Sequence, residues 1–288
     1  KHHRQPYLMK KYLIQLLLRV LMVGANGQTI DVITYNIRYD NPNDKPNNWD
    51  NRKAFLISQL QFYAPDVFGT QEGLVHQLKD IDQGLGDYTY VGIGRDHGDD
   101  RGEFSALFYN TKKLNVLKHS TFWLSETPDV PSKGWDAALP RICTYGLFEN
   151  KADGSKFMVF NTHFDHVGVT ARAESSKLIL KKMKELNPNG LPVILTGDFN
   201  LESDSSGVQV ILGEMTDTHV AVGKNAFGPN GTFNGFEFNK PVERRIDYIF
   251  VSPNNVEVLK SAILSDSKDC RYPSDHLPVF ARLRLVVP

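Results

Sequence analysis

Apolar residues recur along this chain of 288 residues with two different spacings. Short runs rich in Val, Ile and Phe predict buried strands, whereas apolar residues three and four positions apart predict helices. Helices are expected over residues 49–63, 74–85 and 170–186. Strands are expected over residues 30–39, 66–70, 88–93, 104–109, 116–118, 143–148, 157–162, 192–196, 245–251, 256–265 and 277–286.

Strands and helices therefore alternate, but without the strict regularity of repeated βαβ units. The polar segments 94–102 and 126–139 are long loops, and loops of this length in a compact domain are often binding loops. No internal repeat, low-complexity tract or linker divides the chain. The pattern predicts one domain over residues 29–288, with a two-sheet core and helices outside.

The first 28 residues have the pattern of a leader segment. Met9-Lys-Lys11 supplies a start and positive charge, Tyr12–Val23 is mostly apolar, and Ala25-Asn-Gly27 resembles a small-residue cleavage site. Residues 1–8 would then be an N-terminal extension. The alternative is an ordinary amphipathic helix, but no partner surface for it is evident. We therefore expect an exported protein, periplasmic or secreted, and expect no membrane span because the apolar run is too short.

Composition adds exclusions rather than a function. Hydrophobic residues make up 41% of the chain and charged residues 23%, as in a soluble domain with a sizeable core. Lys+Arg and Asp+Glu both number 33, so the chain lacks the overall basic charge with which proteins usually grip long duplex nucleic acid. Two cysteines, Cys143 and Cys270, permit one disulfide but do not make a disulfide framework.

Polar residues of a restricted set of types stand at the ends of six predicted strands. Taken singly, an Asn or Asp there is most often a turn former, a His is most often a surface or satisfied core residue, and a buried Glu is most often half of an ion pair. Together they are hard to explain as turns. The set is Asn36, Glu72 after Gly69-Thr-Gln71, His163, Asp198 with Asn200, Asp247, and Asp275 with His276.

Carboxylates collected in a water-poor site repel one another and lose hydration, and a divalent cation removes both costs. Oxygen ligands from Glu, Asp and Asn, without Cys ligands, favour a hard ion such as Mg²⁺, or Mn²⁺, over zinc. The sequence thus predicts a metal site and proton-transfer groups at one rim of a layered α/β fold.

The ordered series of motifs resembles the endonuclease/exonuclease/phosphatase superfamily, which includes the DNase I-like nucleases. The resemblance runs from about Ile30 to Leu285 and implies a four-layer α/β sandwich, with two packed mixed sheets flanked by helices. Further segments resemble a bacterial branch whose substrate is not settled. These are Gly94-Arg-Asp96, Gly102-Glu-Phe104, Phe122-Trp-Leu-Ser-Glu126 and Trp135-Asp136.

The resemblance also implies roles for the strand-end residues. Glu72 would be the principal metal ligand with Asn36 beside it, and Asp275 would bind the same ion or a second one. Asp198 would position or deprotonate the attacking water, and Asn200 would donate to a phosphoryl oxygen.

The remaining roles concern the histidines and the phosphate. Asp247 would fix the tautomer of His276, and His163 would lie on the leaving-group side as an acid or phosphate donor. Glu103 matches the carboxylate that partners the first His in some members. Arg141 is either a phosphate-binding residue or one half of a surface ion pair. The residues Asp165 and His166 either face the pocket or, in the case of His166, cap the following loop.

The implied reaction is metal-assisted attack of water on a phosphorus ester, of phosphodiesterase or nuclease type. Single-stranded nucleic acid is a candidate substrate because Trp49, Phe122, Trp123 and Trp135 could stack bases, although these aromatics could equally anchor loops to the core. The alternative is a phosphatase or phospholipase C-like enzyme on nucleotides or on small or lipid phosphoesters. A catalytically silent binding protein of the same fold would lack some ligands, and a carbohydrate-binding module would need fewer acids. No protein partner is evident.

Overall fold

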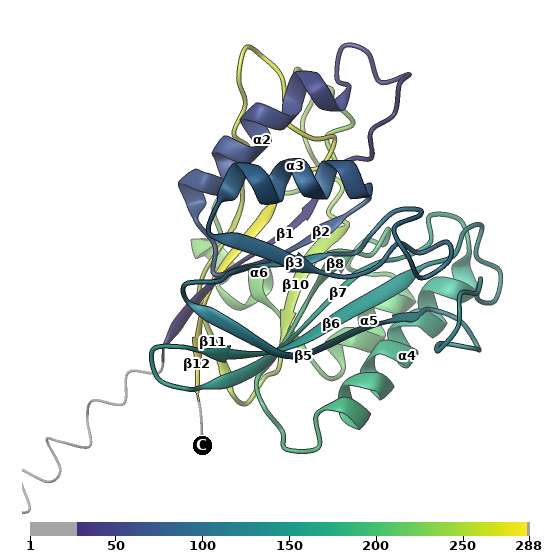
Figure 1. Ribbon diagram of the computed structural model, residues 1–288, viewed down its shortest axis with the longest axis vertical. Coiled ribbons are helices and arrows are strands. Elements are labelled where there is room, and N and C mark those ends of the chain that lie inside the picture. Colours follow the sequence, from purple (N-terminus) through teal and green to yellow (C-terminus); the bar gives the residue numbers. More distant parts are fainter. Residues whose placement is uncertain (1–27, 287–288) are drawn as a thin grey trace, which may run out of the picture.

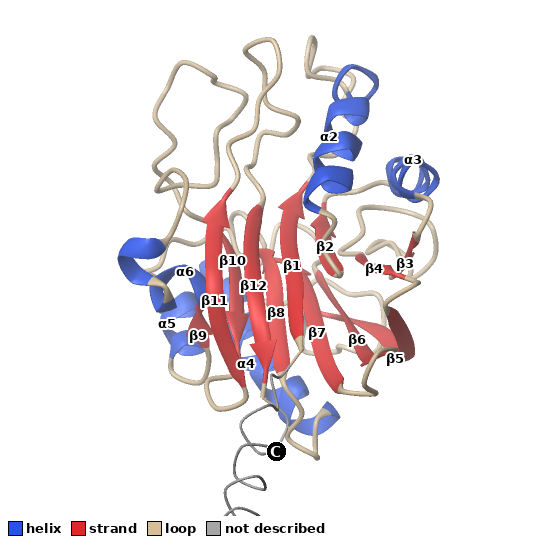
Figure 2. Cartoon of the chain, turned by 90° about the vertical axis from the view of Figure 1, so that its left-hand side faces the viewer, coloured by secondary structure: helices blue, strands red, loops and turns tan. Residues whose placement is uncertain are grey.

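The strands of residues 28–286, which the computed structural model describes, form two six-stranded sheets packed face to face (Figures 1 and 2). The first has the order β11-β12-β1-β2-β4-β3, with bounds Val256–Ile263, Val279–Leu285, Thr29–Asn36, Val67–Gln71, Leu107–Asn110 and Tyr88–Val91. The second has the order β5-β6-β7-β8-β10-β9, with bounds Leu114–Trp123, Ile142–Asn150, Lys156–His163, Val193–Asp198, Asp247–Val251 and Thr216–Asp217.

Helices cover the outer faces of both sheets. The helices α2 (Trp49–Tyr63) and α3 (Val75–Leu85) pack on the first sheet, and α4 (Val169–Leu186) and α5 (Ser206–Leu212) pack on the second (Figure 1). Two short helical segments, α6 (Thr218–Ala221) and η1 (Gly223–Asn225), follow β9. Between the sheets lies an apolar layer of which Val32, Val159 and Ile249 are members. The predicted four-layer α/β sandwich is confirmed.

Most predicted elements are confirmed within a few residues, including α2 at its stated bounds. The edge strand β5 is much longer than the predicted 116–118. The prediction was too short because the exposed middle of the strand is polar and lacks an apolar pattern. The sequence pattern missed α5, β9 and α6. Except for Gln28, the predicted leader lies outside the described residues. Within the described residues, no helix has the length and apolar character that crossing a bilayer requires.

Strand pairing brings the polar strand ends together. The parallel strands β1 and β2 pair Asn36 with Gln71, which directly precedes Glu72, and the parallel strands β7 and β8 pair His163 with Asp198. The antiparallel neighbour β10 begins beside the same end and pairs Asp247 with Asp198. One end of the sandwich therefore collects residues that are far apart in the sequence.

A buried polar layer joins the two sheets beneath this end. Gln71 donates through Nε2 to Oδ1 of Asn161 over 2.7 Å, and Asn161 donates through Nδ2 to the carbonyl oxygens of Thr70 and Ala106 over 2.8 and 2.9 Å. A side chain at Gly69 would place its Cβ 2.4 Å from Asn161 Oδ1. The absence of a side chain at Gly69 thus allows Asn161 to bridge the sheets.

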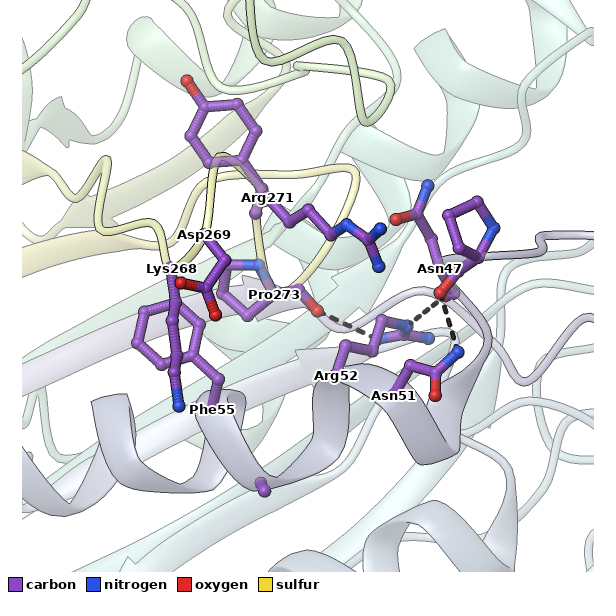
Figure 3. A pocket seen from close by; sticks show the side chains of 11 residues that line it. Asn47, Asn51, Arg52, Phe55, Lys268, Asp269, Arg271 and Pro273 are labelled. Atoms are coloured by element: carbon purple, nitrogen blue, oxygen red, sulfur yellow. Dashed lines mark hydrogen bonds between the residues drawn. The ribbon is translucent and has the colours of Figure 1, made fainter.

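Arg52, a buried residue of α2, ties together three segments that surround the same end. It has no carboxylate within 4.0 Å among the described residues, and burial lowers its pKa to about 10. Because all its bonds go to backbone oxygens, it fixes the chain rather than neutralising an acid. Its guanidinium donates to the carbonyl oxygens of Ile37 and Arg38 (both 2.5 Å), Asn47 (3.0 Å) and Pro273 (3.2 Å). Figure 3 shows the bonds to Asn47 and Pro273.

Candidate active site

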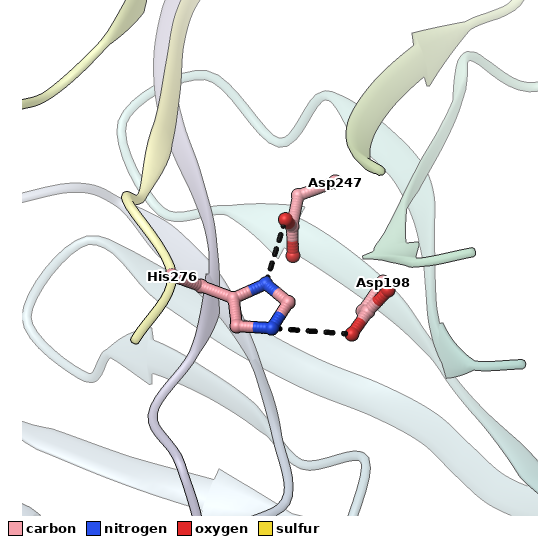
Figure 4. A group of neighbouring side chains, drawn as sticks. All are labelled: Asp198, Asp247 and His276. Atoms are coloured by element: carbon pink, nitrogen blue, oxygen red, sulfur yellow. Dashed lines mark hydrogen bonds and ion pairs between the residues drawn. The ribbon is translucent and has the colours of Figure 1, made fainter. Parts of the chain in front are cut away.

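Asp198, Asp247 and His276 form a buried cluster at the converged strand ends (Figure 4). The His276 Nδ1 atom lies 2.8 Å from Asp247 Oδ2, and its Nε2 atom lies 3.8 Å from Asp198 Oδ2. The sequence places these residues on β8, at the start of β10 and just before β12. The contact between Asp247 and His276 is the one that the family resemblance implied.

Charges within this cluster shift its pKa values strongly. Burial alone would lower the pKa of His276, but the negative charges of Asp247 and Asp198 raise it well above the ordinary histidine value. Burial, then repulsion by Asp247, raises the pKa of Asp198 to about 7. At neutral pH His276 is therefore a cation between two acids, one of which is poised to exchange a proton.

Glu72, Asp275 and Asn36 lie on the other side of Asp198. Asn36 donates through Nδ2 to Glu72 Oε1 over 3.1 Å and to Asp198 Oδ2 over 2.9 Å. Burial, together with repulsion by Glu72, raises the pKa of Asp275. Glu72 has a φ of 65°, in the left-handed region that non-glycine residues rarely adopt. Such strain is typical of functional sites, where the surrounding structure enforces it.

Arg38 stands between these two acids, and the sequence interpretation gave it no role. Its Nε lies 3.7 Å from Asp275 Oδ2, and its Nη1 lies 4.0 Å from Glu72 Oε2. It also makes a two-bond pair with Asp44, at 2.7 and 2.9 Å. Both acids thus lie within reach of one cation. The position of Arg38 directly after the Asn36 motif is the one signal that could have identified it.

The donor set of Glu72 and Asp275 fits a hard cation. Both side chains offer carboxylate oxygens, and Asp275 is buried with a raised pKa, so an added positive charge would relieve their repulsion. Asn36 turns its amide nitrogen, not its oxygen, toward Glu72, because Oδ1 accepts from the backbone N–H of Arg38. As oriented, Asn36 holds the acids in place. The cluster of Asp198 and Asp247 fits a metal less well, because the positive charge of His276 is hydrogen-bonded to Asp247 over 2.8 Å, whereas Arg38 comes no closer than 3.7 Å to Glu72 or Asp275.

His163 and Asn200 close the opposite side of the cluster. Asn200 donates through Nδ2 to the Phe164 carbonyl oxygen over 3.0 Å and lies 3.1 Å from His163 Nε2. Burial, and then the positive charges of Arg141 and Arg95, lower the pKa of His163 well below its ordinary value. His163 is thus neutral. Donation by Asn200 to a phosphoryl oxygen would require it to give up one of these contacts.

Glu103 lies near His163, but its closest partner is Arg95. The pair is joined by two bonds of 2.7 and 2.9 Å, whereas Glu103 Oε2 lies 3.9 Å from His163 Nδ1. That nitrogen is buried without a hydrogen-bond partner among the described residues. Burial raises the pKa of Glu103 to about 7 despite the charge of Arg95. Arg95 is therefore a second site residue that the sequence interpretation left unassigned, although it lies in the quoted segment Gly94-Arg-Asp96.

Arg141 is buried, so the alternative of a surface ion pair is wrong. Its Nη2 lies 3.1 Å from Nδ1 of His166, and its Nε lies 3.6 Å from Asp165. Within the described residues, Nε and Nη1 make no hydrogen bond. A buried guanidinium with unused donors is suited to an anion such as phosphate.

Asp165 organises the loops beside Arg141. Its carboxylate accepts from the backbone N–H groups of Ala138, Leu139, Val167 and Gly168. Although burial opposes it, these bonds hold the pKa of Asp165 well below its usual value. Asp165, rather than His166, therefore ties the loop that follows β7.

Comparisons with protein families and solved structures agree with the resemblance that the sequence motifs show. A family model described as the Endonuclease/Exonuclease/phosphatase family matches residues 33–276. A solved structure of an endonuclease/exonuclease/phosphatase family protein from Bacteroides thetaiotaomicron is 42% identical, with a TM-score of 0.86, and the match covers 91% of this chain and 99% of that one.

Two further matches carry functional names. A mannosyl-6-phosphatase of Bacteroides thetaiotaomicron VPI-5482 is 44% identical with a TM-score of 0.84, over 88% of this chain and 99% of that chain. The Ccr4 3'-5'-exoribonuclease subunit of the CCR4-Not complex of Mycosarcoma maydis is 24% identical over 88% of this chain but 49% of its own length. The first two curated relatives that match, both uncharacterised mimivirus proteins, are covered over 60% and 39% of their length.

Proposed function

The chain belongs to the endonuclease/exonuclease/phosphatase family, and from this membership we propose that it hydrolyses phosphate esters with a divalent metal ion, Mg²⁺ or Mn²⁺. One observation carries the proposal. Asp198, with a pKa of about 7, accepts from Asn36, which also donates to Glu72, and its Oδ2 atom lies 3.5 Å from Nε2 of His163, whose pKa is lowered in part by the charge of Arg141. A phosphoryl group at this place would meet a proton acceptor, positive charge and oxygen ligands for a cation.

In the proposed reaction Glu72 and Asp275 hold the metal, which when bound would neutralise phosphoryl oxygens and steady the leaving oxygen. Asp198 orients the attacking water and accepts its proton. His276, held by Asp247, keeps a positive charge beside Asp198 and offers a proton through Nε2. Apart from Glu72, which is half-buried, these groups are buried, which strengthens their electrostatic contacts.

On the opposite side, the free Nε and Nη1 donors of Arg141 would bind phosphoryl oxygens. Neutral His163 would donate to the phosphate or the leaving oxygen, and the Arg95–Glu103 pair limits its movement. The two sides would thus grip a phosphate between a metal and a guanidinium, which is the arrangement expected for in-line displacement.

For the substrate we favour a phosphomonoester of a sugar or similar small molecule. The relative named as a mannosyl-6-phosphatase supports this choice, since the match spans nearly all of that chain. The sequence alone favoured a nuclease-type activity, partly because aromatics could stack bases. Trp49, Phe122 and Trp123 are buried and anchor loops to the core, so stacking on these three residues is not supported.

A nuclease-type phosphodiesterase is the second candidate. The match to an exoribonuclease subunit favours it, and Trp135 is only partly buried. The two candidates differ in the charge of the group that Arg141 would bind. A terminal phosphate carries up to two negative charges and a diester carries one, so the relative rates on the two classes separate them.

The experiment is a substrate panel with purified protein and Mg²⁺. The panel contains mannose 6-phosphate, a chromogenic phosphodiester, single-stranded DNA and RNA, inositol phosphates and sphingomyelin. We expect hydrolysis of the monoester at the highest kcat/KM, abolished by EDTA and by Asp198→Asn. Hydrolysis of none of them by protein that binds the metal would favour a silent binding protein and overturn the proposal.

We also propose that the protein acts outside the cytoplasm, on the basis of the leader pattern in residues 9–27. Expression of the full gene in a bacterial host, followed by cell fractionation and N-terminal mass spectrometry, tests this. Mature protein beginning near Gln28 in the periplasm or medium would support export. Uncleaved protein confined to the cytoplasm would contradict it.

A further inference from the structure

A pocket of about 420 Å³ lies beside the candidate active site, between the start of α2 and the turn at residues 268–271 (Figure 3). Its lining includes Arg52, Lys268 and Arg271, with Asp269 as the one acid among the lining residues. The apolar part of the lining includes Phe55 and Pro273. This volume and mixture of apolar and polar walls are typical of small-molecule sites.

The turn that carries two of these cations is unusual. Lys268 and Arg271 pair through two backbone hydrogen bonds of 3.0 Å each, with Asp269 and Cys270 between them. Both central residues have positive φ, 52° and 58°. Turns of this form usually contain Gly or Asn, because other side chains are strained in the left-handed region. The chain thus keeps a strained turn at this position.

A second feature of the turn is its positive charge. Lys268 and Arg271 stand opposite each other in the hairpin and are both exposed, and their side chains extend along different parts of the pocket, Lys268 beside Phe55 (Figure 3). Figure 3 shows the Arg271 side chain extending across the pocket toward Asn47. The opposite wall is the first turn of α2, where the helix dipole also favours negative charge, although Asp50 lies in the same turn. The excess of cations over acids in the lining, next to a strained turn and a helix N-terminus, indicates a pocket suited to an anion.

One wall of the pocket, formed by Arg52 and Pro273, lies next to the candidate active site. Arg52 donates to the carbonyl oxygen of Pro273, and Pro273 is two residues from Asp275, so their Cα atoms are at most about 7.6 Å apart. The negative charge of Asp275 also offsets part of the lowering of the Arg52 pKa by burial. An anion in the pocket therefore lies near the group proposed to hold the metal, but none of the lining residues belongs to that group.

We propose that this pocket binds a small organic anion, through a phosphate or carboxylate group held by Arg271 and Lys268. The group is either a second anionic part of the substrate or a separate molecule. Binding of an anion in the pocket does not depend on the proposed reaction. Only the assignment of this anion to the substrate rests on the proposed function.

Cys270 provides a reporter next to this pocket, since it is exposed between the lining residues Asp269 and Arg271, while Cys143, the other cysteine of the chain, is buried. The probe is the rate at which neutral iodoacetamide modifies Cys270, measured by mass spectrometry on EDTA-treated protein titrated with inorganic phosphate or mannose 1,6-bisphosphate. We expect at least a threefold slowing in the wild type. In Lys268→Ala/Arg271→Ala, half-saturation should need about tenfold more anion.

The matched control is Lys118→Ala/Lys224→Ala, which removes two exposed positive charges outside the pocket and should behave as the wild type. Thermal unfolding of both double variants checks that each is folded. Absence of protection in the wild type, or equal protection in the Lys268→Ala/Arg271→Ala protein, would overturn the proposal.

A kinetic arm separates the two sources of the anion. If the anion belongs to the substrate, the wild type hydrolyses mannose 1,6-bisphosphate with a higher kcat/KM than mannose 6-phosphate, and the pocket double variant loses this preference about tenfold. If it is a separate molecule, the preference is absent while Cys270 protection remains. Hydrolysis of neither sugar with Cys270 protection intact would refute the proposed function on sugar phosphates and leave the pocket standing.

Discussion

Asn36 bridges two acids that are 126 positions apart in the sequence, since its Nδ2 atom lies 3.1 Å from Glu72 Oε1 and 2.9 Å from Asp198 Oδ2. Glu72 belongs to the group proposed to hold a cation, and Asp198 to the group proposed to move a proton. A single amide therefore sets the spacing between the two halves of the site. A substitution in the proton-transfer group should therefore change kcat, and a substitution in the metal-binding group should change metal affinity.

The proton-transfer half is tested by Asp247→Asn. Asparagine keeps the shape of the side chain but removes the charge that, with Asp198, raises the pKa of His276. We expect kcat to fall by about 10²- to 10⁴-fold, with KM changed by only a few-fold. Steady-state kinetics measure the first effect, and an NMR titration of His276 measures the lowered pKa. The control is Asp153→Asn on an exposed turn. A kcat within threefold of the wild type would rule out this role for Asp247.

The metal half is tested by Glu72→Gln and Asp275→Asn. Each removes a charged oxygen ligand, so we expect the Mn²⁺ concentration at half-saturation to rise by at least about tenfold. Electron paramagnetic resonance of free Mn²⁺ measures binding without any need for turnover. Glu185→Gln on the exposed face of α4 is the matched control. Full activity in excess EDTA, or unchanged Mn²⁺ binding in both variants, would contradict a metal held by these acids.

The backbone clamp made by Arg52 predicts a large effect from a conservative change. Lysine cannot form the four bonds that the guanidinium makes, so Arg52→Lys leaves buried carbonyl oxygens without donors. We expect a loss of about 2–4 kcal/mol in the free energy of unfolding, measured with urea. Because the clamp joins the chain after Asn36 to the chain before Asp275, Mn²⁺ affinity should also fall.

Arg284→Lys is the control for this prediction. Arg284 is partly exposed and pairs with Glu257 through one bond, so its replacement should change stability by no more than about 0.5 kcal/mol. If the Arg52 and Arg284 variants were equally stable and bound Mn²⁺ equally well, the clamp would have no measurable role.

The sequence predicted the fold and the convergence of the strand-end residues well because both depend on where the strands end. Apolar runs identify the buried strands, and the residue after each run must emerge at the rim. Strand pairing then brought Asn36 beside Glu72, and Asp198 beside Asp247 and His163. The roles assigned to these residues remain predictions. The polar edge strand β5 lacked an apolar run and was predicted at a fraction of its length.

The arginines of the site could not be predicted in the same way. Arg52 binds carbonyl oxygens, which every residue has, so no pattern of side chains reveals it. Arg95 and Glu103 are paired across a loop whose conformation depends on Trp123, which donates to the Arg95 carbonyl oxygen over 2.8 Å. The sequence also could not predict that Asn36 turns its amide nitrogen toward the acids, because this orientation follows from the hydrogen bond that its Oδ1 atom accepts from the backbone N–H of Arg38. Loop geometry and backbone contacts decide these features.

The pH dependence of stability provides a test that needs neither substrate nor metal. Burial and the charges of Arg141 and Arg95 lower the pKa of His163 well below 6.5 in the folded protein. As the pH falls below 6.5, His163 takes up a proton in the unfolded chain but stays neutral in the folded protein. The free energy of unfolding therefore falls by up to about 1.4 kcal/mol per pH unit. His276 acts in the opposite direction, since its raised pKa contributes stability that is present below pH 6.5 and lost as the pH rises through the folded value.

His163→Asn should therefore lose less stability than the wild type when EDTA-treated protein is unfolded with urea at pH 7.5, 6.5 and 5.5. The difference between the two free energies of unfolding should shift in favour of the variant as the pH falls. His119→Asn, on the exposed part of β5, serves as the control and should follow the wild type. Parallel pH profiles for wild type and His163→Asn would mean that His163 is protonated as readily in the folded protein as in the unfolded chain. The neutral donor proposed beside the phosphate would then be a cation at acidic pH.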